Sequence, residues 1–354
     1  MTKSITGSAV CTIGLDIAKN SFSAHGFDAE GKTVLKKELK RHRVLSFFEQ
    51  LAPCRVGLEA CASAHHWARE IAKFGHEVKL VAPMRVKAFL PRMKNDAADA
   101  MAIARAMRDL EMRFVPVKTV ERQSVLMLFK ARDLLVAQRT MIINALRGHF
   151  AEIGIVVAKA AQHVKVLIER VVREDACLPP AMREAMKPLV ATYASLEDEI
   201  SALNRMITTA HKNDERARRL AGVPGIGVLI ATVLSASVSD PKSFASGREF
   251  AAWIGLVPRQ HSTGGKSKLG PISKMGNRDL RRLLVVGATA ALARMRNVKT
   301  KTALNQSALA QWTRALLATK PFRMVTVALA NKMARIAWAI MAKGAVYAPD
   351  HRPA

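Results

Sequence analysis

AVCTIGLDI, residues 9–17, is a continuous apolar run with a single acid, Asp16, near its end. Such a run is typical of a strand that is buried in a sheet. The turn-like tetrad at 29–32, AEGK, separates two further strand-like segments and predicts a hairpin that continues from the first strand. Working outward, predicted strands lie at 9–17, 21–28, 33–39, 55–60 and 77–82, and predicted helices lie at 43–52, 63–75 and 96–110.

This element order divides the chain into three predicted regions. Three antiparallel strands followed by alternating helices and strands are typical of an RNase H-like (RuvC-like) α/β domain, which we place at 1–117. Region 118–218 contains two long segments with apolar residues at helical spacing, 120–151 and 182–213, which predict a long helical hairpin or coiled coil that assembles subunits. Region 219–354 is predicted to be a mostly helical C-terminal domain.

The charge balance indicates the kind of partner. The chain has 354 residues, of which 56 are Lys or Arg and 28 are Asp or Glu, so its formal net charge is +28. Such an excess favours a polyanion, usually nucleic acid, over an anionic membrane surface. Because 50% of the residues are hydrophobic and the basic residues are spread through the globular segments, a basic tail on an unrelated domain does not account for the charge.

Cysteine usage and hydropathy exclude several classes of protein. The four cysteines are scattered without a CxxC spacing, so neither a disulfide framework nor a zinc site is expected. We expect no signal peptide, since the apolar stretch after Lys3 runs directly into the first predicted strand. Charged residues interrupt the late apolar runs, so we expect no membrane span and a cytoplasmic location.

Four acids form the candidate catalytic and metal-binding set. Asp16 and Glu59 each close a predicted strand, and Asp96 and Asp99 lie three residues apart, on one face of a predicted helix. Taken singly, an acid in such a position is more often a turn or capping residue. Together, in a chain of this positive charge, they are typical of a carboxylate cluster that holds magnesium ions about 4 Å apart for phosphodiester chemistry.

A second motif is the turn LAGVPGIG at 220–227, which precedes the apolar segment 228–236. A PGIG turn between two helices is the helix-hairpin-helix signature. In that motif Gly225 and Gly227 let the backbone approach a phosphate at the following helix N-terminus. An ordinary tight turn between helices is the alternative. Three arginines just upstream, at 216, 218 and 219, favour the phosphate contact.

Residues 241–300 carry twelve Lys or Arg against two acids, and they include a loop rich in glycine and lysine at 258–276. Hydroxyls, glycines and lysines with few apolar anchors predict a mobile loop that wraps a phosphate. A hydroxyl flanked by cations is also a candidate nucleophile, although phosphate binding is the favoured interpretation from residue chemistry. The basic residues predicted to bind nucleic acid are Arg259, Lys266, Lys268, Lys274, Arg278, Arg281 and Arg282.

These motifs resemble a known family, the DEDD-type transposases of bacterial insertion sequences and their pilin-gene-inverting relatives. GLDIAK, GLEA and KNDAADA are similar to the RuvC-like tetrad of that family. The stretch from LAGVPGIG through FAAWIGLVPRQHSTGGKSKLGPISKMGNRDLRRLL is similar to its C-terminal transposase domain. The resemblance covers nearly the whole chain, with two motif groups in the same order as in the family.

The resemblance implies a mechanism that the residues alone do not show. Family members attack DNA with a serine, form a covalent phosphoserine intermediate, and bind Mg²⁺ at the RuvC-like acids beside it. The serine position falls on Ser262 or Thr263, and we choose Ser262 because a primary hydroxyl is less hindered. Ser267 and Ser273 are the least favoured candidates for the nucleophile. The resemblance further implies a structured guide RNA encoded by the element, and a homo-oligomer, a dimer of dimers, on RNA and DNA.

Two alternatives to a transposase or recombinase stay open. A RuvC-like junction nuclease would use a metal-activated water and form no covalent adduct. A non-catalytic nucleic-acid-binding scaffold would have the same charge but a decayed acid set, which the four intact acids disfavour.

Overall fold

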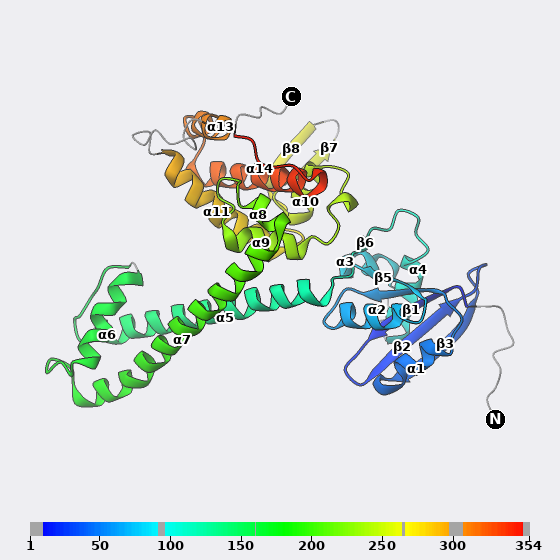
Figure 1. Cartoon of the computed structure of the whole chain (residues 1–354), viewed down its shortest axis with the longest axis horizontal. Coiled ribbons are helices and arrows are strands. Elements are labelled where there is room, and N and C mark those ends of the chain that lie inside the picture. Colours follow the sequence, from blue (N-terminus) through cyan, green and yellow to red (C-terminus); the bar gives the residue numbers. More distant parts are fainter. Residues whose placement is uncertain (1–9, 91–95, 160, 264–265, 297–306, 350–354) are drawn as a thin grey trace. The chain divides into compact units, whose positions relative to one another are not determined.

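The computed structural model describes residues 10–90, 96–159, 161–263, 266–296 and 307–349. The chain forms two compact units, Met1–Val120 and Glu121–Ala354 (Figure 1). The boundary lies close to the predicted end of the first region. The predicted separation of 118–218 from 219–354 stays a prediction, because both belong to the second unit.

A mixed sheet forms the centre of the first unit. Its strand order is β3-β2-β1-β4-β5-β6. β1, β2 and β3 are antiparallel neighbours, β1, β4 and β5 are parallel, and β6 returns antiparallel to β5. The strands are β1 Thr12–Ile17, β2 Ser21–Phe27, β3 Thr33–Lys40, β4 Arg55–Glu59, β5 Glu77–Val81 and β6 Phe114–Val115. The predicted antiparallel start and the alternation that follows are confirmed, whereas the short β6 was not predicted.

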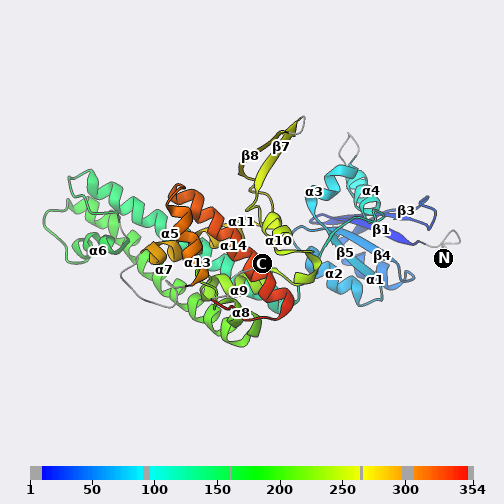
Figure 2. The same ribbon diagram turned by 90° about the horizontal axis from the view of Figure 1, so that it is seen from above.

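Helices cover both faces of this sheet (Figure 2). On one face Ile13 and Leu15 are fully buried in a core that also contains Phe48 of α1 and Trp67 of α2. The other face packs against α4. The helices of this unit are η1 Arg41–Arg43, α1 Val44–Glu49, α2 Ala64–Ala72, α3 Pro83–Val86, η2 Lys87–Phe89 and α4 Asp96–Ala106. Because strand side chains alternate between faces, Gly14 and Asp16 of β1 lie on the face that α4 covers.

Two long helices extend through the second unit, α5 Val120–Ala151 and α7 Pro180–Asn213. Both were predicted within two residues. They run in opposite directions, because Arg132 bonds to Asn204 while Arg139, further along α5, pairs with Glu197, earlier in α7. Between them the structure contains η3 Ala161–His163 and α6 Val164–Val172, where the sequence predicted only a looser stretch.

The remaining helices of the second unit pack into a separate core. They are α8 Glu215–Leu220, α9 Val228–Ser237, η4 Pro241–Ser243, α10 Gly247–Ile254, α11 Arg278–Arg296, α13 Ala308–Leu317 and α14 Phe322–Lys343. A hairpin of β7 Pro258–Thr263 and β8 Lys266–Ile272 projects from this core after α10 (Figure 2).

Helix α14 is long and apolar enough to cross a membrane by length and composition alone. Half of its most apolar window is buried inside the protein, however. Val325, Leu329 and Met333 of this helix are almost completely buried in the core shared with α10 and α11. The burial therefore accounts for its apolar face as a core helix.

Candidate active site

Asp16 and Glu59 lie at one edge of the sheet. β1 and β4 are parallel neighbours, with Leu15 opposite Leu58. Each of these leucines is followed directly by an acid. Because the carboxyl ends of parallel strands meet at one edge of a sheet, the two acids occupy adjacent strand ends. Both are half-buried.

A glycine precedes each of these acids by two residues, on the same face of the sheet, in GLD and GLE. A Cβ at Gly14 would lie 2.1 Å from the Ala100 carbonyl oxygen, and one at Gly57 would lie 2.4 Å from Met107 Cγ. The two glycines therefore let α4 approach the sheet more closely than any larger residue would permit.

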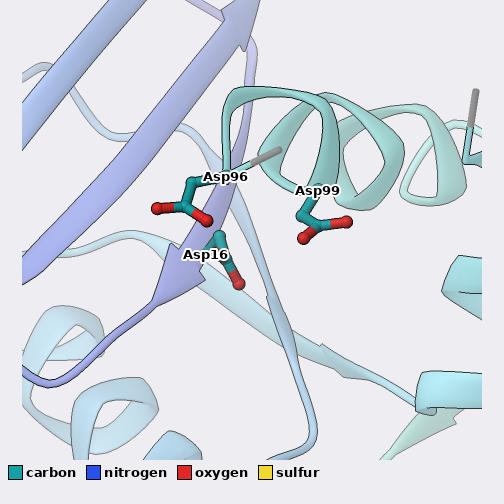
Figure 3. Close-up of side chains that lie close together, drawn as sticks. All are labelled: Asp16, Asp96 and Asp99. Carbon is teal, nitrogen blue, oxygen red and sulfur yellow. The ribbon is translucent and has the colours of Figure 1, made fainter. Parts of the chain in front are cut away.

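This approach brings the first turn of α4 beside the end of β1. The turn carries Asp96 and Asp99, whose side chains converge with Asp16 (Figure 3). One carboxylate oxygen from each of the three acids lies within 4.8 Å of the other two. Glu59 is outside this group of three, on the adjacent strand end. We refer to Asp16, Asp96 and Asp99 as the acid cluster.

The acid cluster is electrostatically crowded. Burial first, and then the negative charges of Asp99, Asp96 and Glu59, raise the pKa of Asp16 to about 6. Within the part of the chain that the structure describes, no Lys or Arg forms an ion pair with any of the four acids. In a chain with a net charge of +28, convergent carboxylates without a protein counter-charge require a cation from elsewhere or a proton.

The donor set fits a hard divalent cation. All the convergent ligands are carboxylate oxygens, and no imidazole or thiolate belongs to the group. Oxygen-only ligation is typical of magnesium, calcium and manganese rather than zinc or copper. The crowding that raises the pKa of Asp16 would be relieved by such an ion, which binds the ionised form.

Ser262 lies in the second unit, on β7. β7 pairs antiparallel with β8, with Ser262 opposite Ser267 and Thr263 opposite Lys266. The prediction of a loop at 258–276 is therefore wrong for 258–263 and 266–272, which are strands. Cross-strand backbone bonding offsets the lack of apolar anchors there. The sequence signal was Gly264-Gly265, a two-residue connection typical of hairpins; these two glycines lie outside the described residues.

Known proteins similar to this chain cover both units. A family model described as "Transposase IS116/IS110/IS902 family" matches residues 217–304, and a second model, described as "Transposase", matches residues 13–155. A "Probable family 20 transposase" of Pseudomonas aeruginosa is 44% identical over 339 residues, which are 95% of this chain and 98% of that protein. The chain belongs to the IS116/IS110/IS902 family of transposases.

Further relatives agree with this membership. The transposase for insertion sequence element IS1328 of Yersinia enterocolitica is 38% identical over 96% of this chain and 98% of that protein. The pilin gene-inverting protein of Moraxella bovis is 24% identical over 78% of this chain and 81% of its own length. The resemblance to insertion-sequence transposases and pilin-inverting proteins is thereby confirmed. As a transposase the chain acts on DNA, and its family implies a divalent metal.

In this transposase the exposed Ser262 hydroxyl accepts a hydrogen bond from Gln260 Nε2 at 3.1 Å. Thr263, the neighbouring residue, is also exposed. Because successive residues of a strand point to opposite faces, the two hydroxyls cannot occupy the same position. Which of the two hydroxyls could reach DNA therefore depends on which face of the hairpin the DNA contacts.

The PGIG turn of the transposase joins α8 to α9, and its two glycines differ. Gly225 has φ +88°, and a Cβ there would lie 2.8 Å from the carbonyl oxygen of Gly287 in α11. Internal packing thus requires this glycine. Gly227 is exposed, and a Cβ there would meet nothing within 4 Å. Open space at the start of α9 makes Gly227 the position where a phosphate could approach.

The predicted basic residues of the transposase also fall into two groups. Arg281 donates from Nη1 to the carbonyl oxygens of Ile254 and Met275, at 2.7 and 2.9 Å, and Arg282 pairs with Asp133 at 2.6 Å. These two arginines therefore bond within the protein. Four others are exposed, and one of them donates to the Ser273 carbonyl oxygen: Arg259, Lys268, Lys274 and Arg278. The side chain of Lys266 lies outside the described residues.

Sequence reasoning missed the role of Gly14 and Gly57. The repeated Gly-Leu-acid pattern was the available signal, because a glycine inside a buried strand marks a close approach of another backbone or side chain. It also missed the cationic side chains that line a pocket at the β1–β2 connection and the end of β3.

Proposed function

We propose that this transposase cleaves and exchanges DNA strands through a covalent phosphoserine intermediate, with an RNase H-like first unit that binds Mg²⁺. The observation that carries the proposal is the convergence of Asp16, Asp96 and Asp99, whose carboxylate oxygens lie within 4.8 Å of one another. The order of the sheet strands and the parallel pairing of β1 with β4 also support the RNase H-like fold.

The nucleophile is the hydroxyl of Ser262. Its Oγ attacks the scissile phosphorus, so a serine–phosphorus bond forms while the bond from phosphorus to one DNA oxygen breaks. The serine proton leaves, and the departing DNA oxygen takes up a proton to become a free hydroxyl. In the reverse sense, a hydroxyl of the exchanged strand attacks the phosphoserine and releases Ser262. Bonds are thereby conserved without an external energy source.

Asp16, Glu59, Asp96 and Asp99 act as ligands. A bound Mg²⁺ supplies Lewis-acid stabilisation of the phosphoryl oxygens. Asp16 must be ionised to bind it, and its raised pKa, about 6, makes that ionisation pH-dependent in the physiological range. The close packing of α4 against Gly14 holds Asp96 and Asp99 at the position where they can share one cation with Asp16.

The second unit holds the DNA backbone in this proposal. The N–H groups at the start of α9, beside the open Gly227, bind a phosphate in the manner of a helix-hairpin-helix motif. Exposed positive charge is present on and near the β7–β8 hairpin that carries Ser262, which we call the serine hairpin; it comes from Arg259, Lys268, Lys274 and Arg278. Such contacts fix register on the DNA without reading bases. Target choice therefore falls to another component, for which we propose the guide RNA encoded by the element.

The long helix α5 supports assembly as a homo-oligomer, a dimer of dimers. Four apolar side chains recur on it every seven residues, and each is more than half exposed: Val120, Met127, Leu134 and Met141. A seven-residue apolar repeat is typical of a coiled-coil seam. An exposed stripe of this kind is expected to be covered by a partner.

Trapping on a nicked DNA substrate tests the nucleophile. The substrate carries one end of the element, with a nick placed so that the cleaved fragment diffuses away and the reaction cannot reverse. We expect a denaturation-resistant protein–DNA adduct with wild type and with Thr263→Ala, and none with Ser262→Ala. Cleavage by Ser262→Ala at the wild-type rate would indicate a water nucleophile, and loss of the adduct only in Thr263→Ala would assign Thr263.

A further inference from the structure

A basic pocket lies at the edge of the sheet that also carries the acid cluster. It has a volume of about 600 Å³ and is lined by Lys19, Asn20, Ser21, Lys40, Arg41 and His42. Lys19 and Asn20 connect β1 to β2, which begins at Ser21, and Arg41 and His42 follow Lys40, the last residue of β3. Since the end of β1, the start of β2 and the end of β3 meet at one edge, the pocket lies at the same edge of the sheet as Asp16. At that edge Arg41 lies on the face that α2 covers, and Asp16 lies on the face that α4 covers.

Arg41 contacts two aromatic rings and two backbone carbonyl oxygens at this pocket. Its guanidinium lies over the rings of Trp67 and Phe22, 5.2 and 5.7 Å from their centroids. Its backbone N–H donates to Asn20 O at 3.0 Å, and its Nη1 donates to Lys19 O at 3.4 Å. These contacts tie the β1–β2 connection to the end of β3 and place the Arg41 guanidinium at the pocket.

The positive charge of the pocket is not neutralised from within. Among the described residues, no carboxylate pairs with Lys19, Lys40 or Arg41. Lysines on the edge strand β3 could serve only to prevent strand pairing with another chain. That role does not explain Lys19, which lies outside β3, or the convergence of cationic side chains from two segments around one hollow.

The position next to the acids narrows the class of ligand. Lys19 follows Asp16 by three residues, so their Cα atoms are at most about 11 Å apart. A phosphodiester chain whose scissile phosphate lies at the acid cluster would therefore pass within reach of these cations. The acids repel neighbouring phosphates, and unpaired lysines and a fixed arginine offset that repulsion.

We propose that this pocket binds backbone phosphates of the DNA strand that flank the scissile phosphate at the acid cluster. The inference rests on the proposed function for the location of the scissile phosphate. It adds an anchoring site in the first unit to the contacts proposed for the second.

The salt dependence of DNA binding tests the site. We compare full-length wild type with Lys19→Gln/Lys40→Gln, using a fluorescent mixed-sequence DNA duplex. The matched control is Lys32→Gln/Lys36→Gln, which removes the same charge from exposed positions of the same hairpin, outside the pocket. Arg41 is left intact because its ring contacts also stabilise the fold. Each lost phosphate contact lowers the slope of log affinity against log salt by about 1.

We therefore expect the slope to fall by about 2 in the pocket variant and to stay at the wild-type value in the control. Equal slopes in the two variants would overturn the proposal. The same titration with an RNA duplex of the same sequence decides the nucleic acid. If the pocket variant loses RNA affinity alone, the pocket serves RNA and the proposal is wrong.

A neutral-linkage scan of cleavage locates the contact. Methylphosphonate linkages replace single phosphates on either side of the cleaved position. We expect a neutral linkage at one or two flanking positions to slow cleavage by wild type and by the lysine control. The same linkage should cause no further loss of cleavage rate in Lys19→Gln/Lys40→Gln, because the linkage and the substitutions remove the same contact. The same additional loss at every position in all three proteins would contradict the proposal.

A parallel measurement with Asp16→Asn separates this inference from the proposed function. If Asp16→Asn cleaves normally, the assignment of the acids fails, and the salt slopes still decide whether the pocket binds DNA. If Asp16→Asn is inactive and the pocket variant has the same salt slope as the lysine control, the catalytic assignment of the acids is supported and DNA binding by the pocket is refuted.

Discussion

The acid cluster and the serine hairpin contribute opposite kinds of structure to one proposed reaction. Asp16, Asp96 and Asp99 are held by a buried sheet and by a helix in near-backbone contact with it. Ser262 lies on β7, every residue of which is exposed. An isolated two-stranded hairpin is marginally stable in water. The acids are therefore preorganised by folding, and in the proposed reaction we expect Ser262 to be ordered by bound DNA.

The largest expected effect concerns the acid cluster. Asp16→Asn should lower strand cleavage by about 10³-fold or more, because loss of a metal ligand removes several kcal/mol of transition-state stabilisation. DNA affinity and its salt slope should stay at wild-type values. Glu38→Gln, which removes an exposed acid of the same sheet, is the control and should cleave normally. Equal loss in both variants would show that charge, rather than ligation, is responsible.

The packing that preorganises the acids is the next to test. Gly14→Ala places a methyl group against the Ala100 carbonyl oxygen and should destabilise the first unit by about 3 kcal/mol, as overpacking does. It should also weaken metal binding as α4 moves away. Gly148→Ala, in the last turn of α5 with nothing within 4 Å, should not destabilise and should add at most about 0.5 kcal/mol. Thermal melting and metal titration measure both. If Gly14→Ala left the melting temperature and the metal affinity unchanged, the close approach of α4 to the sheet would be refuted.

The raised pKa of Asp16 predicts an unusual pH dependence of stability. Its folded pKa, about 6, exceeds the ordinary aspartate pKa of 3.8. The folded state therefore binds more protons between these values, and metal-free protein should lose stability as pH rises from about 4 to about 6. After allowance for solvent screening we expect roughly 1 kcal/mol.

Thermal melting in the presence of a chelator, at a series of pH values, measures this loss. Asp16→Asn should flatten the pH profile, and added Mg²⁺ should restore stability near pH 7. A wild-type profile that rises across this range, or one that is identical in Asp16→Asn, would contradict the assignment.

The smallest expected effect lies in the PGIG turn. Gly227→Ala should leave stability nearly unchanged, since the added methyl group meets nothing within 4 Å. It should weaken DNA binding by about 0.5–1 kcal/mol, because the methyl group crowds a phosphate at the start of α9. DNA titration at fixed salt measures the change. Gly225→Ala should instead destabilise the protein, since Gly225 has a positive φ and packs on Gly287.

Local patterns predicted the first unit well. Ile13 and Leu15 alternate with Gly14 and Asp16, and that period of two places the strand and its acid from sequence alone. The same approach failed at 258–272, because strands that are exposed on both faces have no apolar alternation to detect. It also missed α6, although the buried Val164, Leu167 and Val171 recur at helical spacing there and were an available signal.

The basic pocket shows a further limit. Lys19 and Arg41 are separated by two strands in the sequence, and only the antiparallel pairing of β2 with its neighbours brings them together. Trp67, over which Arg41 lies, comes from a helix still further along the chain. No spacing rule joins three such residues, so the sequence contained the charges without indicating the pocket.

The sequence by itself determined that this is a basic transposase with an acid at the end of each of two apolar strands and an Asp-x-x-Asp helix. Each of these features depends on local composition and periodicity. Only the tertiary structure decided that α4 lies against Gly14 closely enough for three carboxylates to converge, and that burial and these neighbouring charges raise the pKa of Asp16. That decision depends on packing between residues some 85 positions apart, and no local pattern encodes such a distance.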